Sequence, residues 1–135
     1  MEIQIILNRV QCRECGEVLT SHHRHDYKTC GCTNETMVDG GNEYQRYGGL
    51  NLDLVDTSST IHLSDDHMMN RSAAHWGNRG KDGKSALSYK SIADMSNDHI
   101  LNILIDMGGK IAPWMEDIMD KEILYRNSNN ITIDD

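Results

Sequence analysis

Four cysteines in two close pairs are the feature that most constrains the fold of this chain. Cys12 and Cys15 are separated by two residues and are followed by Gly16, whereas Cys30 and Cys32 are separated by a single residue. Two such pairs, joined by a short hairpin, can bring four thiolates to one tetrahedral Zn²⁺ ion, the usual closed arrangement of a structural site. Every cysteine of the chain is used in this way. We therefore predict a structural zinc site.

The ligand set has an alternative. The pair Cys30 and Cys32 is the tighter and less usual half of the pattern, and one of its members could yield its place to a histidine. His25 is the reserve ligand, with His22 also within reach, because a neutral imidazole binds zinc. A third alternative is that no metal binds. In either metal-bound form a closed site holds a fold together and carries out no reaction.

Composition makes the metal important for stability and indicates a compartment. The chain of 135 residues contains no Phe and eight Met, so its core is small and adaptable. Structural zinc contributes roughly 10 kcal/mol or more to the folding of small fingers. The first residues lack a secretory signal pattern and no apolar run reaches membrane-spanning length, so a reduced zinc site is favoured over two disulfides. We expect a cytoplasmic protein with no membrane partner.

The charge of the chain bears on its partners. The formal net charge is -8, from 13 Lys and Arg against 21 Asp and Glu. Neutralisation of phosphates supplies most of the affinity of nucleic-acid binding, so an acidic chain is a poor general binder of DNA or RNA. A protein partner fits this charge better.

The pattern of the first half predicts a zinc-ribbon-like β head over residues 1–49. Alternating apolar residues predict a strand over residues 2–10, and residues 17–20 and 26–29 are expected to pair as a hairpin. A short strand over residues 36–39 ends at a glycine pair. Residues 50–63 are expected to form one more strand, on the alternation of Leu50 with the next leucines, and then a linker.

The second half predicts a mainly helical module over residues 64–127, which makes the fold class α+β. Ser64 is the expected cap of a short helix, a short basic hairpin loop follows it, and an antiparallel pair of helices begins at Ser96 and near Pro113. Glu122 and Arg126 are expected to form an ion pair on the solvent side of the last helix. Residues 128–135 are expected to form a flexible tail.

A basic segment inside this acidic chain is a candidate contact site. Residues 71–90 carry five Lys or Arg against Asp82 alone. Glycines in the segment expose backbone N–H groups to an anion, and an indole is available for stacking on a base. The alternative is that the segment docks on acidic helices of its own chain or is simply solvated. The candidate residues for anion or partner contact are Arg71, Trp76, Arg79, Lys81 and Lys84.

A histidine cluster raises an enzymatic alternative. His22, His23 and His25 next to Asp26 resemble the metal-binding hairpin of a His-metal finger nuclease. Such nucleases need a further metal ligand on a following helix, whereas a short strand and a glycine turn follow here. An exposed hairpin tip is the simpler interpretation, and no other catalytic motif is present.

Two groups of motifs together resemble a known family. The chain is similar to a family of small uncharacterised proteins of tailed bacteriophages. The resemblance rests on Cys12-x2-Cys15-Gly16, His25-Asp26-Tyr27, Cys30-Gly31-Cys32, Val38-Asp39-Gly40-Gly41 with Tyr44 and Arg46, and the later stretch from Trp76 to Lys84. It implies a phage-encoded protein acting in the cytoplasm of the infected bacterial host, and it implies no reaction.

These observations lead to one main hypothesis and two alternatives. The main hypothesis is a zinc-binding interaction protein that binds a host protein, such as a defence system component, and regulates or inhibits it. The first alternative is a zinc-ribbon nucleic-acid-binding protein that uses the basic segment of residues 71–90. The second alternative is a His-metal finger nuclease.

Overall fold

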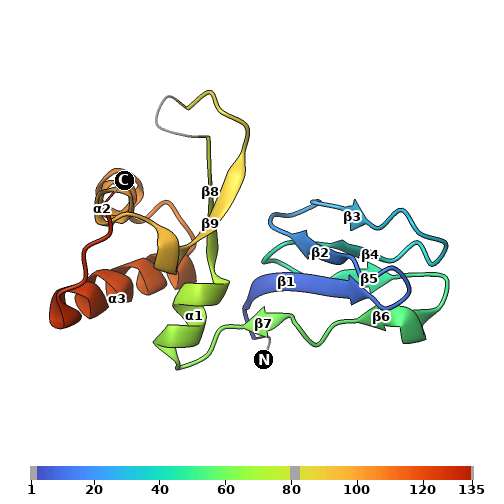
Figure 1. The fold of residues 1–135 in the computed structure, drawn as a ribbon. Helices are drawn as coiled ribbons and strands as arrows, with labels where there is room; N and C mark the ends of the chain where they lie inside the picture. The colour runs from blue at the N-terminus through green and yellow to red at the C-terminus, as the bar shows by residue number, and fades with distance from the viewer. Residues whose placement is uncertain (1–2, 80–82, 135) are drawn as a thin grey trace. The chain divides into compact units, whose positions relative to one another are not determined.

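The computed structural model describes residues 3–79 and 83–134 and has the expected α+β class. The chain divides into two compact units, Met1–Leu63 and Ser64–Asp135 (Figure 1). We call them the N-terminal unit and the C-terminal unit and describe each by itself.

The N-terminal unit is built from two antiparallel sheets. The first joins β1 (Ile5–Cys12) to β2 (Val18–Ser21), β6 (Val55–Asp56) and β7 (Ile61–His62). The second has the order β3 (Lys28–Thr29), β4 (Met37–Asp39), β5 (Arg46–Gly48). Strand β4 also contacts β1 and β2, so the two sheets lie against each other.

The prediction that residues 17–20 pair with residues 26–29 was wrong. Strand β2 pairs with β1, where Leu19 lies opposite Val10, and β3 pairs with β4, where Thr29 lies opposite Met37. Each cysteine pair therefore lies in the turn region of its own hairpin. The β1–β2, β2–β3 and β3–β4 connections span five, six and seven residues, so loop length does not decide which strands pair.

Residues 50–63 differ from the expected strand and linker. Leu52–Leu54 form a 3-10 helix, η1, and the Leu50 and Leu52 side chains are 75% and 61% exposed. The Asn51 side chain accepts a hydrogen bond from the Asp53 N–H at 3.0 Å, and such local bonds compete with extended structure. Strands β6 and β7 then pair with β1, so this segment belongs to the N-terminal unit.

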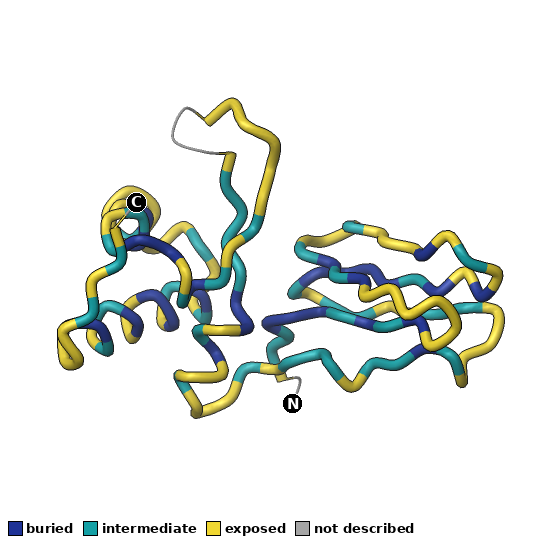
Figure 2. Tube along the Cα trace, viewed as in Figure 1, coloured by how far each residue is buried: buried dark blue, intermediate teal, exposed yellow. Residues whose placement is uncertain are grey.

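Figure 2 shows where each unit is buried, and the core of the N-terminal unit includes two of the cysteines. Its buried cluster consists of Val10, Cys12, Leu19, Cys30, Val38 and Val55. A polar residue, Asn8, is also 1% exposed, and its Nδ2 donates to the carbonyl oxygens of Asp39, Gly41 and Tyr44 at 3.2, 3.0 and 3.1 Å. These bonds hold the glycine turn that follows β4 against the first sheet.

Substitution of Gly41 by alanine should destabilise the N-terminal unit by about 1–3 kcal/mol. Gly41 has φ +55°, and a Cβ there would run into the backbone of His23. Urea denaturation measures the loss. Gly48→Ala is the matched control, because its nearest neighbour would be the Met37 Sδ at an ordinary 3.6 Å. Equal stability of the two variants would contradict the structure of this turn.

The C-terminal unit combines helices with a β-hairpin. Strands β8 (His75–Asn78) and β9 (Ser88–Ser91) pair in antiparallel fashion. The helices are α1 (His67–Ala73), η2 (Ile92–Asp94), α2 (Asn97–Met107) and α3 (Pro113–Asn129). Helix α3 contacts α1, α2 and η2. In Figure 1, α2 is seen end-on and α3 is seen from the side.

The helix starts are partly those expected. Ser96 caps α2, with its Oγ accepting from the His99 N–H at 3.1 Å, and α3 begins at Pro113. The prediction that Ser64 caps the first helix was wrong, because Asp66 caps α1. The Asp66 side chain accepts a hydrogen bond from the Met68 N–H at 3.0 Å.

The last residues are held more firmly than a flexible tail. Helix α3 continues through Asn129, and Asn130 ends it in the left-handed conformation at φ +55°. The Asn97 N–H donates to the Ile133 carbonyl at 2.9 Å, and the Ile133 N–H donates to the Asn97 side chain at 2.9 Å. These bonds attach residues 131–133 to the start of α2, which corrects the prediction of a flexible tail over residues 128–135, of which Asp135 lies outside the described residues.

Candidate metal centre

The first cysteine pair is held by the turn between β1 and β2. The Gly16 N–H donates to the Cys12 carbonyl at 2.8 Å, and the Cys12 N–H donates to the Glu17 carbonyl at 3.0 Å. Gly16 has φ +81°, a conformation that glycine adopts at little cost. Cys12 is buried and Cys15 is exposed, so the turn presents one thiol from the core and one from the surface.

The second cysteine pair is held by the loop between β3 and β4. The Cys30 N–H donates to the Thr36 carbonyl at 3.0 Å, and the Glu35 N–H donates to the Cys32 carbonyl at 3.1 Å. The buried Asn34 anchors this loop, because its carbonyl accepts from the Leu50 N–H at 2.7 Å. The loop therefore has a fixed shape around Cys30 and Cys32.

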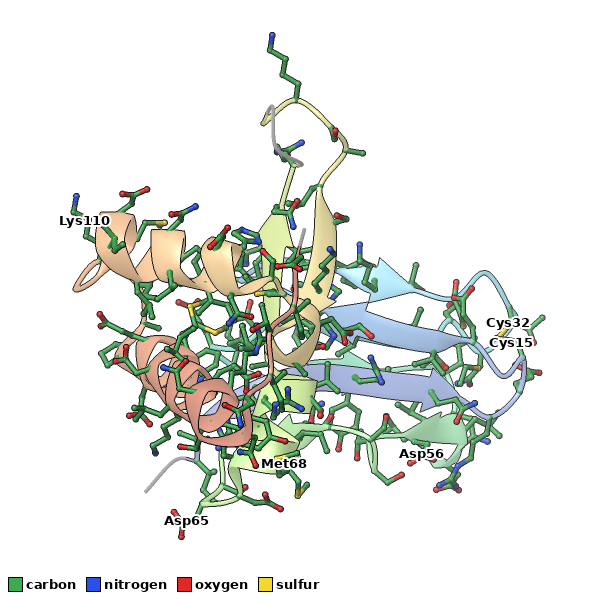
Figure 3. All side chains as sticks on the ribbon, turned by 60° about the vertical axis from the view of Figure 1, so that its left-hand side comes forward. Cys15, Cys32, Asp56, Asp65, Met68 and Lys110 are labelled. Carbon is green, nitrogen blue, oxygen red and sulfur yellow. The ribbon has the colours of Figure 1, made fainter. Side chains whose placement is uncertain are left out.

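The two turns bring all four cysteine sulfurs together. Their Sγ atoms lie within 4.8 Å of one another, with 3.5 Å between Cys12 and Cys32 and 3.4 Å between Cys30 and Cys32. Sulfurs at the corners of a regular tetrahedron around zinc, at a Zn–S distance of about 2.3 Å, lie about 3.8 Å apart. All four thiols are free of disulfides, and Figure 3 shows Cys15 and Cys32 next to each other. The cluster fits a metal site.

The electrostatics of the cluster favour a cation at its centre. A hydrogen bond from the Thr36 side chain, helped by the Cys15 backbone and opposed by burial, lowers the pKa of Cys12 to about 6. The Asn34 backbone lowers the pKa of Cys32, but burial and the neighbouring thiols outweigh it and raise that pKa to about 12. Four thiolates so close together repel one another, and a divalent ion removes that repulsion.

The reserve ligand His25 lies outside the cysteine cluster. Its Nδ1 lies 3.3 Å from the Tyr44 hydroxyl, and its backbone is left-handed at φ +64°. The Asp26 carboxylate accepts a hydrogen bond from the His22 backbone N–H at 2.8 Å. Burial raises the pKa of Asp26, but this bond and Lys28 outweigh burial and lower that pKa. Within residues 3–79 and 83–134, the four cysteines are the only group that could hold a metal ion.

The described candidate residues of the basic segment have different surroundings. Arg71 is withdrawn into the C-terminal unit, as described below. Trp76 is half-buried on β8 opposite Lys90, and Arg79 and Lys84 are exposed. Lys81 lies outside the described residues. What remains is a hairpin that carries exposed cations.

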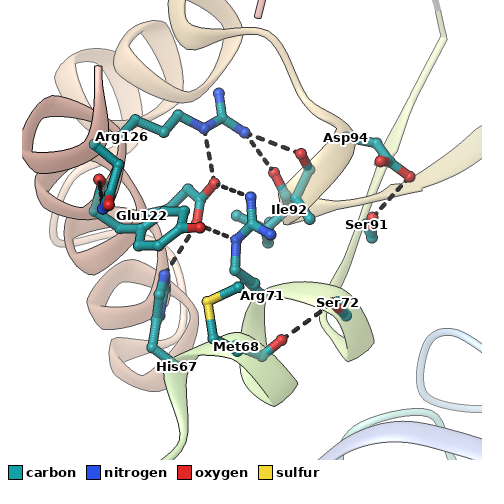
Figure 4. A network of polar contacts seen from close by, with 12 residues as sticks. His67, Met68, Arg71, Ser72, Ser91, Ile92, Asp94, Glu122 and Arg126 are labelled. Carbon is teal, nitrogen blue, oxygen red and sulfur yellow. Dashed lines mark hydrogen bonds and ion pairs between the residues drawn. The ribbon is translucent and has the colours of Figure 1, made fainter. Parts of the chain in front are cut away.

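A buried ionic network in the C-terminal unit was missed by the sequence analysis (Figure 4). The Glu122 carboxylate is 0% exposed and accepts from Arg71 Nε and Nη2 at 2.7 and 2.8 Å. Arg126 Nε donates to it at 2.7 Å, and His67 Nε2 lies 2.9 Å from it. The prediction that Glu122 and Arg126 lie on the solvent side was wrong, because both are fully buried.

The arginines of the network make further bonds, whereas the buried His67 Nδ1 has no hydrogen-bond partner among the described residues. Arg126 also donates to the Asn97 side chain at 2.9 Å and to the Ile92 and Ala93 carbonyls at 3.1 and 3.3 Å. Burial raises the pKa of Glu122, but its hydrogen bonds from arginine and histidine outweigh burial and lower it. With its carboxylate held by three side chains, the network serves packing between helices. The spacing of Glu122 and Arg126 in register with the buried Ile118 was the available sequence signal.

Comparison with known proteins adds one finding. Residues 4–49 match a family model described as "Domain of unknown function (DUF7695)". The match covers β1 through β5 and all four cysteines. Comparison with curated proteins and with solved structures found no match. Among the described residues, no helix combines the length and apolar character needed to cross a bilayer.

Proposed function

We propose that the N-terminal unit is a zinc-stabilised module through which the chain binds another protein. The observation that supports this proposal is the meeting of four cysteine sulfurs from two hairpins. A site with four protein ligands leaves no open position for substrate or water, so it stabilises a fold and catalyses no reaction. Two of the cysteines belong to the hydrophobic core of the unit, which couples metal binding to folding.

Zinc is the metal that this ligand set favours. Four thiolates in tetrahedral geometry select zinc or iron, and a closed four-cysteine site between two hairpins is typical of structural zinc. Its four thiolates would leave a local charge of about -2 around the ion.

The partner that we propose is a protein of the infected bacterial cell. The resemblance to tailed-phage proteins and the net charge of -8 support this class of partner. Binding in the host cytoplasm would regulate or inhibit the partner, with defence system components as the class to examine first. An acidic protein competes well for a basic surface, because opposite charges speed association.

One experiment tests both parts of this proposal. The tagged chain is purified from bacterial lysate with and without nuclease treatment, and the eluate is analysed by mass spectrometry and for metal content. We expect one zinc ion per chain and a stoichiometric protein partner that survives nuclease. Iron in place of zinc would overturn the metal assignment, and partners that vanish with nuclease would overturn the protein-binding assignment.

The β8–β9 hairpin supports a second candidate function, nucleic-acid binding. Lys90 on β9 and Arg79, directly after β8, are exposed, and Trp76 lies on β8 opposite Lys90. If this candidate is right, affinity for a single-stranded oligonucleotide should fall by about tenfold or more as salt rises from about 50 to about 200 mM, because bound counterions are released. The double variant Arg79→Ala/Lys90→Ala should flatten that dependence. No binding at the lower salt concentration eliminates the candidate.

A further inference from the structure

A groove lies beside the second cysteine pair of the N-terminal unit. Its volume is about 500 Å³, and its lining includes Tyr27, Thr29, Gly31, Cys32, Glu35 and Leu50. The groove therefore lies at the proposed zinc site, and the loops that build it are those that position the ligands.

Two large apolar side chains line this groove. Tyr27 is 52% exposed and Leu50 is 75% exposed. The position of Leu50 is fixed, because its N–H donates to the Asn34 carbonyl at 2.7 Å and the next N–H, of Asn51, donates to the Asn34 side chain at 2.8 Å. Asn34 itself is 3% exposed. Leu50 is thus held in solvent by a rigid loop, and such exposure of apolar side chains beside a groove is typical of contact surfaces.

One carboxylate, that of Glu35, lines the same groove. Glu35 is exposed within it, and over residues 3–79 and 83–134 no side chain forms a hydrogen bond or ion pair with its carboxylate. Glu14 adds a second carboxylate next to the cluster, 3.5 Å from the Cys32 sulfur and 2.9 Å from the Thr33 hydroxyl. The four thiolates of a zinc site would add further negative charge at the wall that Cys30 and Cys32 form.

Glu35 also occupies a strained backbone position. Its φ is +53°, in the left-handed region that glycine and asparagine adopt more easily than glutamate. The loop therefore places a charged side chain in the groove at a conformational cost. The turn that positions Cys32 accounts for this backbone conformation, because the Glu35 N–H donates to the Cys32 carbonyl at 3.1 Å.

We propose that this groove binds a basic segment of a protein partner. An apolar side chain of that segment would lie between Tyr27 and Leu50, and a neighbouring Lys or Arg would pair with Glu35. The Glu35 carboxylate, with Glu14 next to the cysteine cluster, favours this occupant over an acidic segment or a nucleic acid. The inference rests on the proposed function and specifies the surface and the partner chemistry.

Selection from a library of random displayed dodecapeptides on the full zinc-loaded chain tests the inference. We expect enriched peptides that carry Lys or Arg next to an aliphatic or aromatic residue. The affinity for the best peptide should fall about tenfold in Glu35→Asn and in Leu50→Ser, since each removes one of the two contacts. Glu17→Gln removes an exposed carboxylate outside the groove and should leave the affinity within about twofold of the parent.

Stability separates this role from a structural one. Glu35→Asn relieves the left-handed strain, so its thermal midpoint should rise while its zinc content stays at one ion per chain and its peptide affinity falls. A lower midpoint, or an enriched peptide that binds both groove variants as well as the parent, would overturn the inference. A host protein that binds both variants like the parent would leave the proposed function standing and remove this inference alone.

Discussion

Substitution of Cys15 by serine should release the metal ion and unfold the N-terminal unit. Structural zinc contributes roughly 10 kcal/mol or more to small zinc-binding domains, which matches or exceeds the whole stability of a typical small domain, about 5–15 kcal/mol. The expected result is loss of zinc and of amide protection in β1 and β4, measured by metal analysis and hydrogen exchange. Protection in α3, which carries no metal ligand, provides the internal reference.

A comparison of two serine variants identifies the cause of this loss. Cys30 is 3% exposed and packs in the core, whereas Cys15 is exposed. If metal binding holds the unit together, both variants unfold it. If only the packing of buried sulfur matters, Cys30→Ser is destabilised and Cys15→Ser is not. Retention of zinc and of the native fold by Cys15→Ser would therefore contradict the four-cysteine site, as would an unchanged fold after a zinc chelator has removed the metal.

The cysteine cluster could be predicted because its geometry is local. The gap between Cys12 and Cys15 and the glycine after it fit a tight turn, and Cys30 and Cys32, with Gly31 between them, lie close together in the next hairpin. Which strands pair was harder to predict, because the histidine-rich segment has the polar composition of a hairpin tip. In the structure the Ser21 hydroxyl donates to the Asp26 carbonyl at 2.7 Å, and this loop connects two hairpins.

The errors elsewhere arise from interactions that a local pattern does not contain. The alternation of Leu50 and Leu52 resembles a strand, but the Asn51 side chain and the Asn34 anchor set the backbone there. Glu122 and Arg126 have the spacing of a surface ion pair, and their burial depends on Arg71, a residue 51 positions from Glu122. Helical periodicity shows which residues share a face, and a distant partner determines whether a charged face is buried.

Replacement of Glu122 by glutamine should destabilise the C-terminal unit by about 3–5 kcal/mol. The variant leaves Arg71 and Arg126 buried without a counter-charge, and one side of the amide would present N–H groups to their donors. Thermal or urea denaturation measures the loss. Asp117→Asn is the matched control on the same helix, because its 2.9 Å pair with Lys121 is 59% and 58% exposed and should contribute less than about 1 kcal/mol.

The pH dependence of stability provides a second test of the same network. The folded-state pKa of Glu122 is lowered from 4.5, so its contribution is fully present above that pH and is lost as the pH falls through the folded-state pKa. The parent should therefore lose stability in acid more steeply than Glu122→Gln, and the two should converge at low pH. Parallel acid profiles, or a loss no larger than that of Asp117→Asn at neutral pH, would show that the carboxylate is uncharged or solvated. A converging pair of profiles instead identifies Glu122 as the buried anion that holds α1, α3 and the Ile92 carbonyl together through its two arginines.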